Sequence, residues 1–160
     1  MQIQLVRAYD RKNEIKALFS EYTDMLIAGD SRFAGYLGIQ NYDEELAHLE
    51  HKYGEPEGRL YIALVDGRTA GCIALRRIDD ARCEMKRLYV RPEFRGVHLG
   101  ELLARKIIED AREIGYKELL LDTLPFLESA IHLYEKLGFV LIEKYNDSPM
   151  DTSIYMKLTL

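Results

Sequence analysis

The chain has 160 residues, of which 48% are hydrophobic and 31% charged, so it is long enough for one compact domain over residues 1–160. Its net charge of −5 disfavours nucleic acid as a partner, and no apolar run is long enough to span a bilayer, so we expect no membrane partner. Cys72 and Cys83 fall in expected strands, without metal or disulfide spacing, which predicts buried thiols in a reducing compartment. The charged N-terminus does not resemble a signal peptide, and we expect a cytoplasmic protein.

The first half of the chain predicts a strand, two helices and a three-stranded meander. Residues 2–7 alternate polar and apolar side chains, whereas residues 13–28 and 42–52 carry apolar side chains at helical spacing. Strands follow at 60–65 and 70–75, joined by Asp66-Gly67, a dipeptide typical of tight hairpins. A third strand of this meander covers residues 83–90.

The second half predicts two helices and three strands. Residues 99–114 form an amphipathic helix that Gly115 can cap, and residues 118–123 form an apolar strand buried on both faces. A second helical stripe covers residues 127–137, and strands at 139–142 and 154–158 close the chain. The order β-α-α-β-β-β-α-β-α-β-β predicts a mixed α/β (α+β) fold, with a single central mixed sheet of about seven strands flanked by four helices.

A glycine-containing turn lies between the strand that ends at Arg91 and the helix that follows. It reads Arg95-Gly96-Val97-His98-Leu99-Gly100. The N–H groups of such a turn converge with a helix N-terminus on one point, which suits a phosphate. Neither the G-x-G-x-x-G spacing of a Rossmann fold nor the G-K-[ST] of a P-loop is present. The loop alone leaves open a phosphate site and a simple tight turn.

Together with a later helix, this loop resembles the GNAT superfamily of acyl-CoA-dependent N-acetyltransferases. The family's loop pattern is Q/R-x-x-G-x-G/A. Its second signature, A-x-x-x-Y-x-K-x-G-F, is matched by Ala130, Tyr134, Lys136, Gly138 and Phe139. The resemblance is closest over residues 61–142 and points to a bacterial group of unassigned substrate. His98 replaces a loop glycine, which a residue with helical backbone angles would tolerate, and Leu127 replaces a common asparagine.

The resemblance implies acetyl-CoA as co-substrate and no metal. The pantetheine arm would pair with the backbone of Leu88, Tyr89 and Val90. The pyrophosphate would meet the N–H groups of Arg95, Gly96, Val97, His98, Leu99 and Gly100. Lys136 would reach the same phosphates or point to solvent. The basic run Arg82, Lys86, Arg87, Arg91 and Arg95 would attract phosphates or form a solvated strand face.

The resemblance also implies that the acceptor amine attacks the thioester directly, without a protein nucleophile. Glu84 lies where the family often keeps a carboxylate, so it is a candidate general base acting through a water; the alternative is a structural carboxylate paired with Lys86. Tyr134 lies where many members keep a tyrosine that donates a proton to the departing CoA thiolate; the alternative is core packing in its own helix.

The acceptor, a primary amine of a small molecule or peptide, would bind between the N-terminal helices and the last strands. Candidate residues there are Tyr22, Phe33, Tyr36, Tyr42 and the loop Tyr145, Asn146, Asp147, Ser148 and Pro149. The histidines His48, His51 and His132 show no second ligand at metal spacing, so no metal is expected. A non-catalytic acyl-CoA-binding sensor, O-acylation and a protein substrate stay open as alternatives, as does a homodimer.

Overall fold

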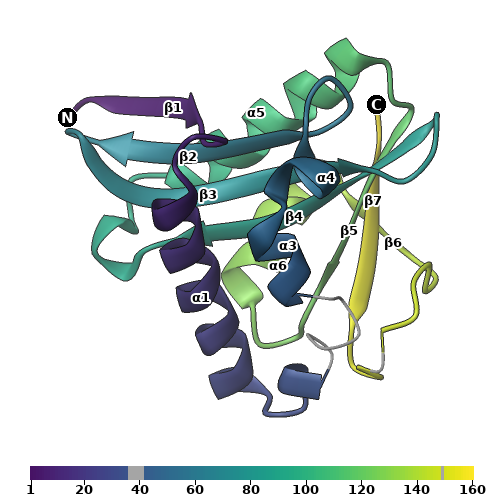
Figure 1. Ribbon diagram of the computed structural model, residues 1–160. Coiled ribbons are helices and arrows are strands. Elements are labelled where there is room, and N and C mark those ends of the chain that lie inside the picture. Colours follow the sequence, from purple (N-terminus) through teal and green to yellow (C-terminus); the bar gives the residue numbers. More distant parts are fainter. Residues whose placement is uncertain (36–41, 149) are drawn as a thin grey trace.

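A seven-stranded sheet forms the middle of the molecule (Figure 1). The computed structural model describes residues 1–35, 42–148 and 150–160, apart from the side chain of Tyr42. The strand order is β1-β2-β3-β4-β5-β7-β6; β4 and β5 pair in parallel and the other neighbours antiparallel. The expected mixed fold, with one sheet flanked by helices, is confirmed.

The elements follow the expected order along the chain. The strands are β1 (Ile3–Arg7), β2 (Arg59–Val65), β3 (Arg68–Arg77), β4 (Arg82–Val90), β5 (Glu118–Thr123), β6 (Val140–Ile142) and β7 (Ile154–Thr159). The helices are α1 (Lys12–Gly29), α3 (Tyr42–Ala47), α4 (Leu49–Tyr53), α5 (Leu99–Ile114) and α6 (Glu128–Lys136), with a 3-10 turn over Pro92–Phe94. The single helix expected over residues 42–52 is two short ones, because His48 leaves the helical region with φ −136° and ψ 62°.

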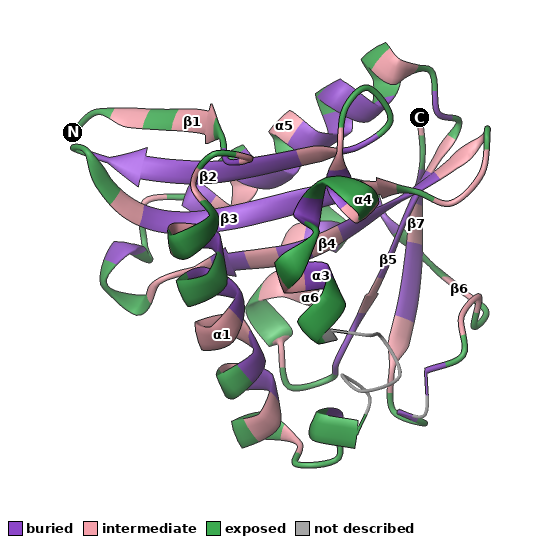
Figure 2. Cartoon of the chain, viewed as in Figure 1, coloured by how far each residue is buried: buried purple, intermediate pink, exposed green. Residues whose placement is uncertain are grey.

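Helices cover both faces of the sheet and create two apolar cores. Helices α1 and α4 bury side chains such as Ile15, Phe19 and Leu49 against β2 and β3 on one face. Helix α5 buries a stripe of residues four apart, including Leu103 and Ile107, on the opposite face. The central strands are accordingly the most buried part of the chain (Figure 2). Both cysteines are buried free thiols, as expected. Within the described ranges, no helix is long and apolar enough to cross a membrane.

The expected hairpin at Asp66-Gly67 is confirmed by its backbone. Both residues have positive φ, 50° and 79°, and Val65 pairs with Arg68 across the turn. Two successive positive φ values define the turn whose twist matches that of paired strands, and glycine adopts this geometry without steric cost. The sequence pattern therefore predicted this turn, and the second strand begins at Arg68 rather than at the expected residue 70.

Strands β4 and β5 pair only over their first three residues. The pairs are Arg82 with Glu118, Cys83 with Leu119 and Glu84 with Leu120. Beyond them β4 continues along β3 to Val90, whereas β5 continues along β7 to Thr123. The two strands therefore diverge after Glu84. From there on, the edge of β4 that faces β5 has no strand partner in the described part of the chain.

A β-bulge at Arg87 reshapes β4 where the strands diverge. The pairs on either side of it are Cys72 with Tyr89 and Ala74 with Lys86. Two residues of β4 thus oppose one residue of β3, and Arg87 has a φ of 61°. A bulge bends its strand and re-aims its side chains. Leu88 and Val90 pack toward the core under α5, whereas Arg87 turns toward α3.

A buried ion pair holds this bulge against the N-terminal helices. Arg87 donates from two guanidinium nitrogens to the two oxygens of Glu45 on α3, each at 3.0 Å. Lys52 of α4 donates to the same carboxylate at 2.7 Å. Burial alone would raise the pKa of Glu45, but the two cations outweigh it and lower that pKa to about 2. The bulge and two short helices therefore depend on one carboxylate.

Glu45→Gln is expected to destabilise the fold by about 3–5 kcal/mol at pH 7, because it leaves a buried cation facing a neutral amide. The stabilisation is present above the ordinary carboxyl pKa of 4.5 and is lost as pH falls toward about 2, so urea unfolding of wild type and variant should converge in acid. The control is Asp80→Asn at the exposed Arg77–Asp80 pair, where little or no destabilisation is expected because solvent screens the two charges. Equal losses in the two variants would contradict this role of Glu45.

Candidate active site

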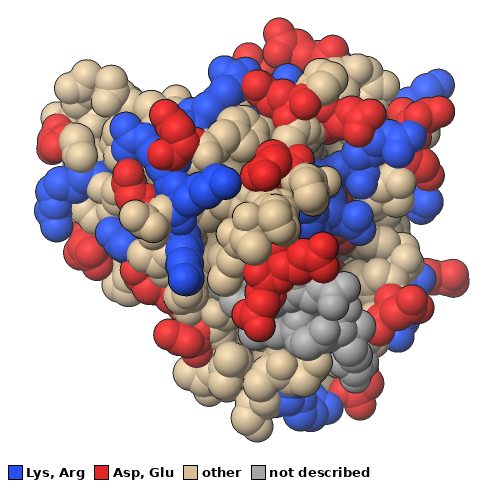
Figure 3. Space-filling model, in the orientation of Figure 1, with Lys and Arg blue, Asp and Glu red and all other residues tan. Residues whose placement is uncertain are grey.

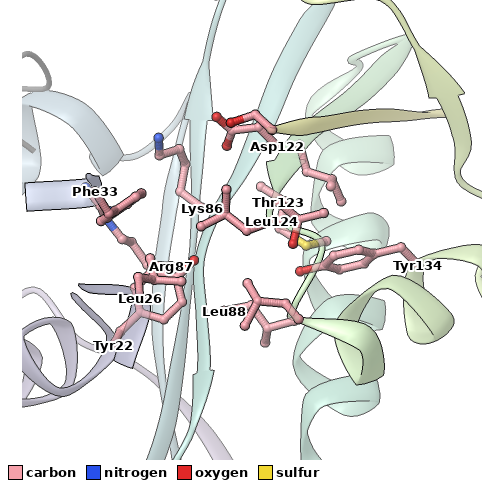
Figure 4. Close-up of a pocket in the computed structure, with 14 residues that line it drawn as sticks. Tyr22, Leu26, Phe33, Lys86, Arg87, Leu88, Asp122, Thr123, Leu124 and Tyr134 are labelled. Atoms are coloured by element: carbon pink, nitrogen blue, oxygen red, sulfur yellow. The ribbon is translucent and has the colours of Figure 1, made fainter. Parts of the chain in front are cut away.

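A pocket opens where β4 and β5 diverge, between α1 on one side and α6 on the other (Figure 4). The pocket is lined by Tyr22, Leu26, Phe33, Met85, Lys86, Arg87, Leu88, Leu121, Asp122, Thr123, Leu124, Leu127, Tyr134 and Ser153. Strand β4 contributes the residues around the bulge, and β5 contributes its last residues. The pocket is therefore a direct consequence of the strand divergence.

Tyr134 projects from α6 into this pocket (Figure 4). Its ring packs on Phe139 with the centroids 5.6 Å apart, and the residue is 7% exposed. Burial raises the pKa of Tyr134 above its ordinary value of 10.0, so the phenol keeps its proton at neutral pH. In the described part of the chain its hydroxyl has no hydrogen-bond partner. A protonated phenol is thus held in the pocket with its hydroxyl unpaired.

Glu84 lies at the point where β4 and β5 separate, and other side chains already hold its carboxylate. Arg76 donates to one oxygen at 2.6 Å, the Tyr145 hydroxyl donates to the other, and Lys86 lies 3.9 Å away. Burial alone would raise the pKa of Glu84, but these neighbours outweigh it and hold the pKa below 4.5. Glu84 does not line the pocket. It is an ionised carboxylate, buried behind the pocket wall.

The loop between β4 and α5 presents unpaired backbone N–H groups. The amides of Gly96, Val97 and His98 donate to no acceptor in the described part of the chain, and α5 begins at Leu99. The amide of Arg95 departs from the expectation, because it donates to the carbonyl of Pro92 at 3.2 Å. The remaining amides and the helix N-terminus form the kind of donor array that binds phosphate.

His98 has left-handed backbone angles, with φ 60° and ψ 28°. Right-handed helical angles would let a histidine replace the glycine without strain, but His98 does not have those angles. A side chain with a Cβ is strained in this region, and glycine is not. The geometry explains why the family pattern has glycine at this position.

The other expected cofactor contacts are placed around this loop. Leu88 lines the pocket, Val90 packs near Gly100, and Tyr89 turns to the opposite face against Tyr22. The ammonium of Lys136 lies 2.6 Å from Glu101 in the first turn of α5. Most of the expected basic run is also held by carboxylates of this chain. Those pairs are Arg82 with Asp79, Arg87 with Glu45 and Arg91 with Glu21.

The structure brings some of the expected acceptor residues to the pocket and leaves others apart. Tyr22 and Phe33 line it. The loop after β6 lies behind it, where Tyr145 holds Glu84 and Asn146 donates to Asp122 at 3.1 Å. Ser148 is buried in the same loop, and Asp147 is exposed. Tyr36, the side chain of Tyr42 and Pro149 lie outside the described residues.

Two charged residues of the pocket were missed as site residues by the sequence analysis. Asp122 ends the apolar run of β5, and this polar residue after three leucines was the available signal. Lys86 was considered only as a partner of Glu84 or as part of a basic run, yet it lines the pocket. Their proximity depends on strand divergence, which no local pattern shows.

Three exposed residues correct the expectation that no histidine has a second ligand at metal spacing. Potential ligand atoms of His48, Glu50 and His51 lie within 4.8 Å of one another, and the two imidazole rings stack. His132 is exposed on α6. The histidine pair lies on the break between α3 and α4, away from the residues that line the pocket.

Comparison with known proteins agrees with this geometry. The model of the acetyltransferase (GNAT) family matches residues 13–139. An uncharacterized N-acetyltransferase of Schizosaccharomyces pombe is 38% identical over all of this chain and 95% of its own length. The chain belongs to the GNAT family. A second uncharacterized N-acetyltransferase, from Dictyostelium discoideum, is 30% identical over the full length of both proteins. Because both relatives are eukaryotic, the narrower expectation of a bacterial group is not supported.

More distant GNAT proteins share the fold or part of the chain. An acetyltransferase structure from Streptococcus agalactiae superimposes with a TM-score of 0.79 at 24% identity, covering 99% of this chain and 98% of that one. The PaiA N-acetyltransferase of Thermoplasma acidophilum, solved with coenzyme A, gives 0.76 at 17% identity over both full chains. Human N-acetylaspartate synthetase is 34% identical over 59% of this chain and 32% of its own. The fold and family are those of acetyltransferases.

His98→Gly is expected to raise the free energy of unfolding by up to about 1.5 kcal/mol. Glycine removes a left-handed backbone cost of about 1–2 kcal/mol and adds about 0.5–1 kcal/mol of chain entropy to the unfolded state. Urea unfolding measures the difference, with His98→Ala as the control that keeps the Cβ and should give no gain. A gain in the alanine variant, or none in the glycine variant, would show that the backbone at His98 is not strained.

Proposed function

We propose that this protein transfers an acetyl group from acetyl-CoA to a primary amine of a small molecule or peptide. One observation carries the proposal: the strand divergence forms a pocket that contains the unpaired hydroxyl of Tyr134, and a loop with free N–H groups follows the same strand. Membership of the GNAT family supports it, as does the coenzyme A bound by the PaiA neighbour.

The residues present fit acetyl-CoA as co-substrate in two respects. The amides of Gly96, Val97 and His98, together with the N-terminus of α5, would hold the pyrophosphate. The edge of β4 that lacks a β5 partner, over Leu88–Val90, would hydrogen-bond the pantetheine amides as an added strand does. When bound, acetyl-CoA supplies an acyl thioester that is activated toward amines.

Tyr134 would act as the acid of the reaction. The acceptor nitrogen forms a bond to the acyl carbon, the carbon–sulfur bond breaks, and the sulfur leaves with the electron pair. The Tyr134 hydroxyl, protonated and unpaired, would donate its proton or a hydrogen bond to that sulfur. The remaining contribution of the protein is to position the two substrates in the pocket.

Glu84 would act as the base, receiving the proton of the acceptor amine through a water. An alkylamine has a pKa near ~10.4, so it must lose a proton before it attacks. Because the pKa of Glu84 lies below 4.5, its carboxylate is ionised at neutral pH and can accept that proton. The contacts with Arg76 and Tyr145 would also suit a structural carboxylate, and the effect of Glu84→Gln on kcat decides between the two roles.

The acceptor proposed here is a small molecule or peptide, as the name of the N-acetylaspartate synthetase relative suggests for that enzyme. Acidic and basic side chains are interspersed on the face drawn in Figure 3, which offers nucleic acid no continuous basic surface there. The alternative is a non-catalytic acyl-CoA-binding module, which would not require the Tyr134 hydroxyl. A single domain over residues 1–160, a cytoplasmic location and a homodimer stay predictions.

Tyr134→Phe is expected to lower kcat about 100-fold or more and to leave the KM for acetyl-CoA unchanged, because only the proton donor is removed. The assay follows thiol release from acetyl-CoA with a panel of amines. Acetyl-CoA should raise the Tm of the wild type and of Tyr134→Phe alike. Tyr116→Phe is the matched control, since its hydroxyl donates to the carbonyl of Glu57, away from the pocket. Undiminished turnover of Tyr134→Phe across pH would exclude the acid role.

Glu84→Gln is expected to lower kcat by a constant factor between pH 5 and 9, because the wild-type carboxylate is ionised throughout that range. The rate should still rise with pH in both the wild type and Glu84→Gln, because the acceptor amine loses its proton as pH rises. Glu118→Gln, at the half-exposed Lys157 pair, serves as control. A lower Tm with an unchanged kcat would assign Glu84 a purely structural role.

A further inference from the structure

Lys86 is a buried cation on the wall of the pocket. Its side chain is 9% exposed, and its ammonium donates no hydrogen bond in the described part of the chain. The carboxylate oxygen closest to it, on Glu84, is 3.9 Å away and already accepts a hydrogen bond from Arg76 at 2.6 Å. An ammonium has three donors, and leaving them unmade in a buried site is costly. The position therefore needs acceptor oxygens that the described side chains do not supply.

The surroundings of Lys86 carry an excess of positive charge. Glu45 is shared by Arg87 and Lys52, and Glu84 is shared by Arg76 and the Tyr145 hydroxyl. Among the described residues, four basic side chains thus share these two carboxylates. Burial and the neighbouring Lys86 lower the pKa of Lys52 to about 8, which reflects this crowding of cations. An anionic group bound at Lys86 would neutralise the excess.

The opposite wall of the pocket carries a negative charge. Asp122, at the end of β5, lines the pocket on the side of Tyr134 and projects toward the β4 wall (Figure 4). The apolar side chains of Leu26 and Leu124 line the same pocket. A small ligand in this space meets an ammonium on one wall and a carboxylate on the other.

We propose that the acceptor is an amino acid or a related small amine with a carboxylate beside its amino group, and that Lys86 binds this carboxylate. Asp122 then attracts the amino end toward the side of the pocket that holds Tyr134. Lys86 does not bind the phosphates of acetyl-CoA in this proposal. The loop that would hold those phosphates follows Val90, which lies roughly 10–13 Å along the strand from Lys86. The inference rests on the proposed function and narrows its acceptor class.

The test compares each of the twenty common amino acids with its own carboxamide, which keeps the amine and the side chain but removes the negative charge. Thiol release from saturating acetyl-CoA should be faster with at least one amino acid than with its carboxamide. Lys86→Met should raise the KM for that amino acid about 10- to 100-fold and leave the KM for its carboxamide unchanged. Lys86→Arg should retain the preference, and Lys16→Met, at an exposed lysine of α1, should behave as wild type.

Two outcomes would overturn the inference: carboxamides that react as well as amino acids, or a Lys86→Met variant that weakens both to the same extent. Failure of the proposed function has a different signature, namely no Tm shift with acetyl-CoA and no thiol release with any amine. In that case the Tm shift produced by the amino acids alone, in wild type and Lys86→Met, still decides whether Lys86 binds a carboxylate. No Tm shift in the wild type, or an equal Tm shift in the wild type and Lys86→Met, would show that Lys86 does not bind a carboxylate.

Discussion

The divergence of β4 from β5 after Glu84 is the constraint on which the rest of the site depends. Two parallel strands give up their ladder after three pairs, so one edge of β4 keeps backbone groups without a strand partner. Such groups are costly when buried and need another partner. In the described part of the chain, the unpaired edge and Tyr134 border one pocket, and the free amides follow on the same strand. Lost sheet hydrogen bonds thus open a pocket in the middle of the sheet.

The bulge at Arg87 is the local device that accompanies this divergence. It adds one residue to β4 and turns a cation toward α3, where Glu45 binds it. A buried ion pair seldom stabilises a fold more than apolar packing would. The Arg87–Glu45 pair lies beside the pocket and ties the short helices α3 and α4 to the strand that lines it. This placement fits a role in positioning β4.

Charge in the pocket is distributed unequally between its walls. The wall of β4 carries cations that exceed their carboxylate partners, whereas β5 contributes Asp122. Charges in a partly buried site are screened little by solvent, so this polarity orients a small ligand more strongly than the same charges on the surface would. The shape of the pocket follows from the backbone, and the proposed preference for an amino acid depends on the few charged side chains that line it.

Local sequence signals determined the elements, the Asp66-Gly67 turn and the family, because periodicity, turn residues and the motifs around Gly100 and Tyr134 act over a few residues. They also pointed to the loop before α5, whose free amides the structure shows within the described residues. The helix expected over residues 42–52 is broken at His48. Helix propensity depends on local sequence and not on how the segment packs, so it did not predict this break. Only the tertiary structure showed the left-handed backbone of His98, the contacts of Glu84 with Arg76 and Tyr145, and Lys86 and Asp122 on facing walls. Those features depend on where strands separate and which side chains a bulge re-aims, and both are set by contacts between residues far apart in the chain.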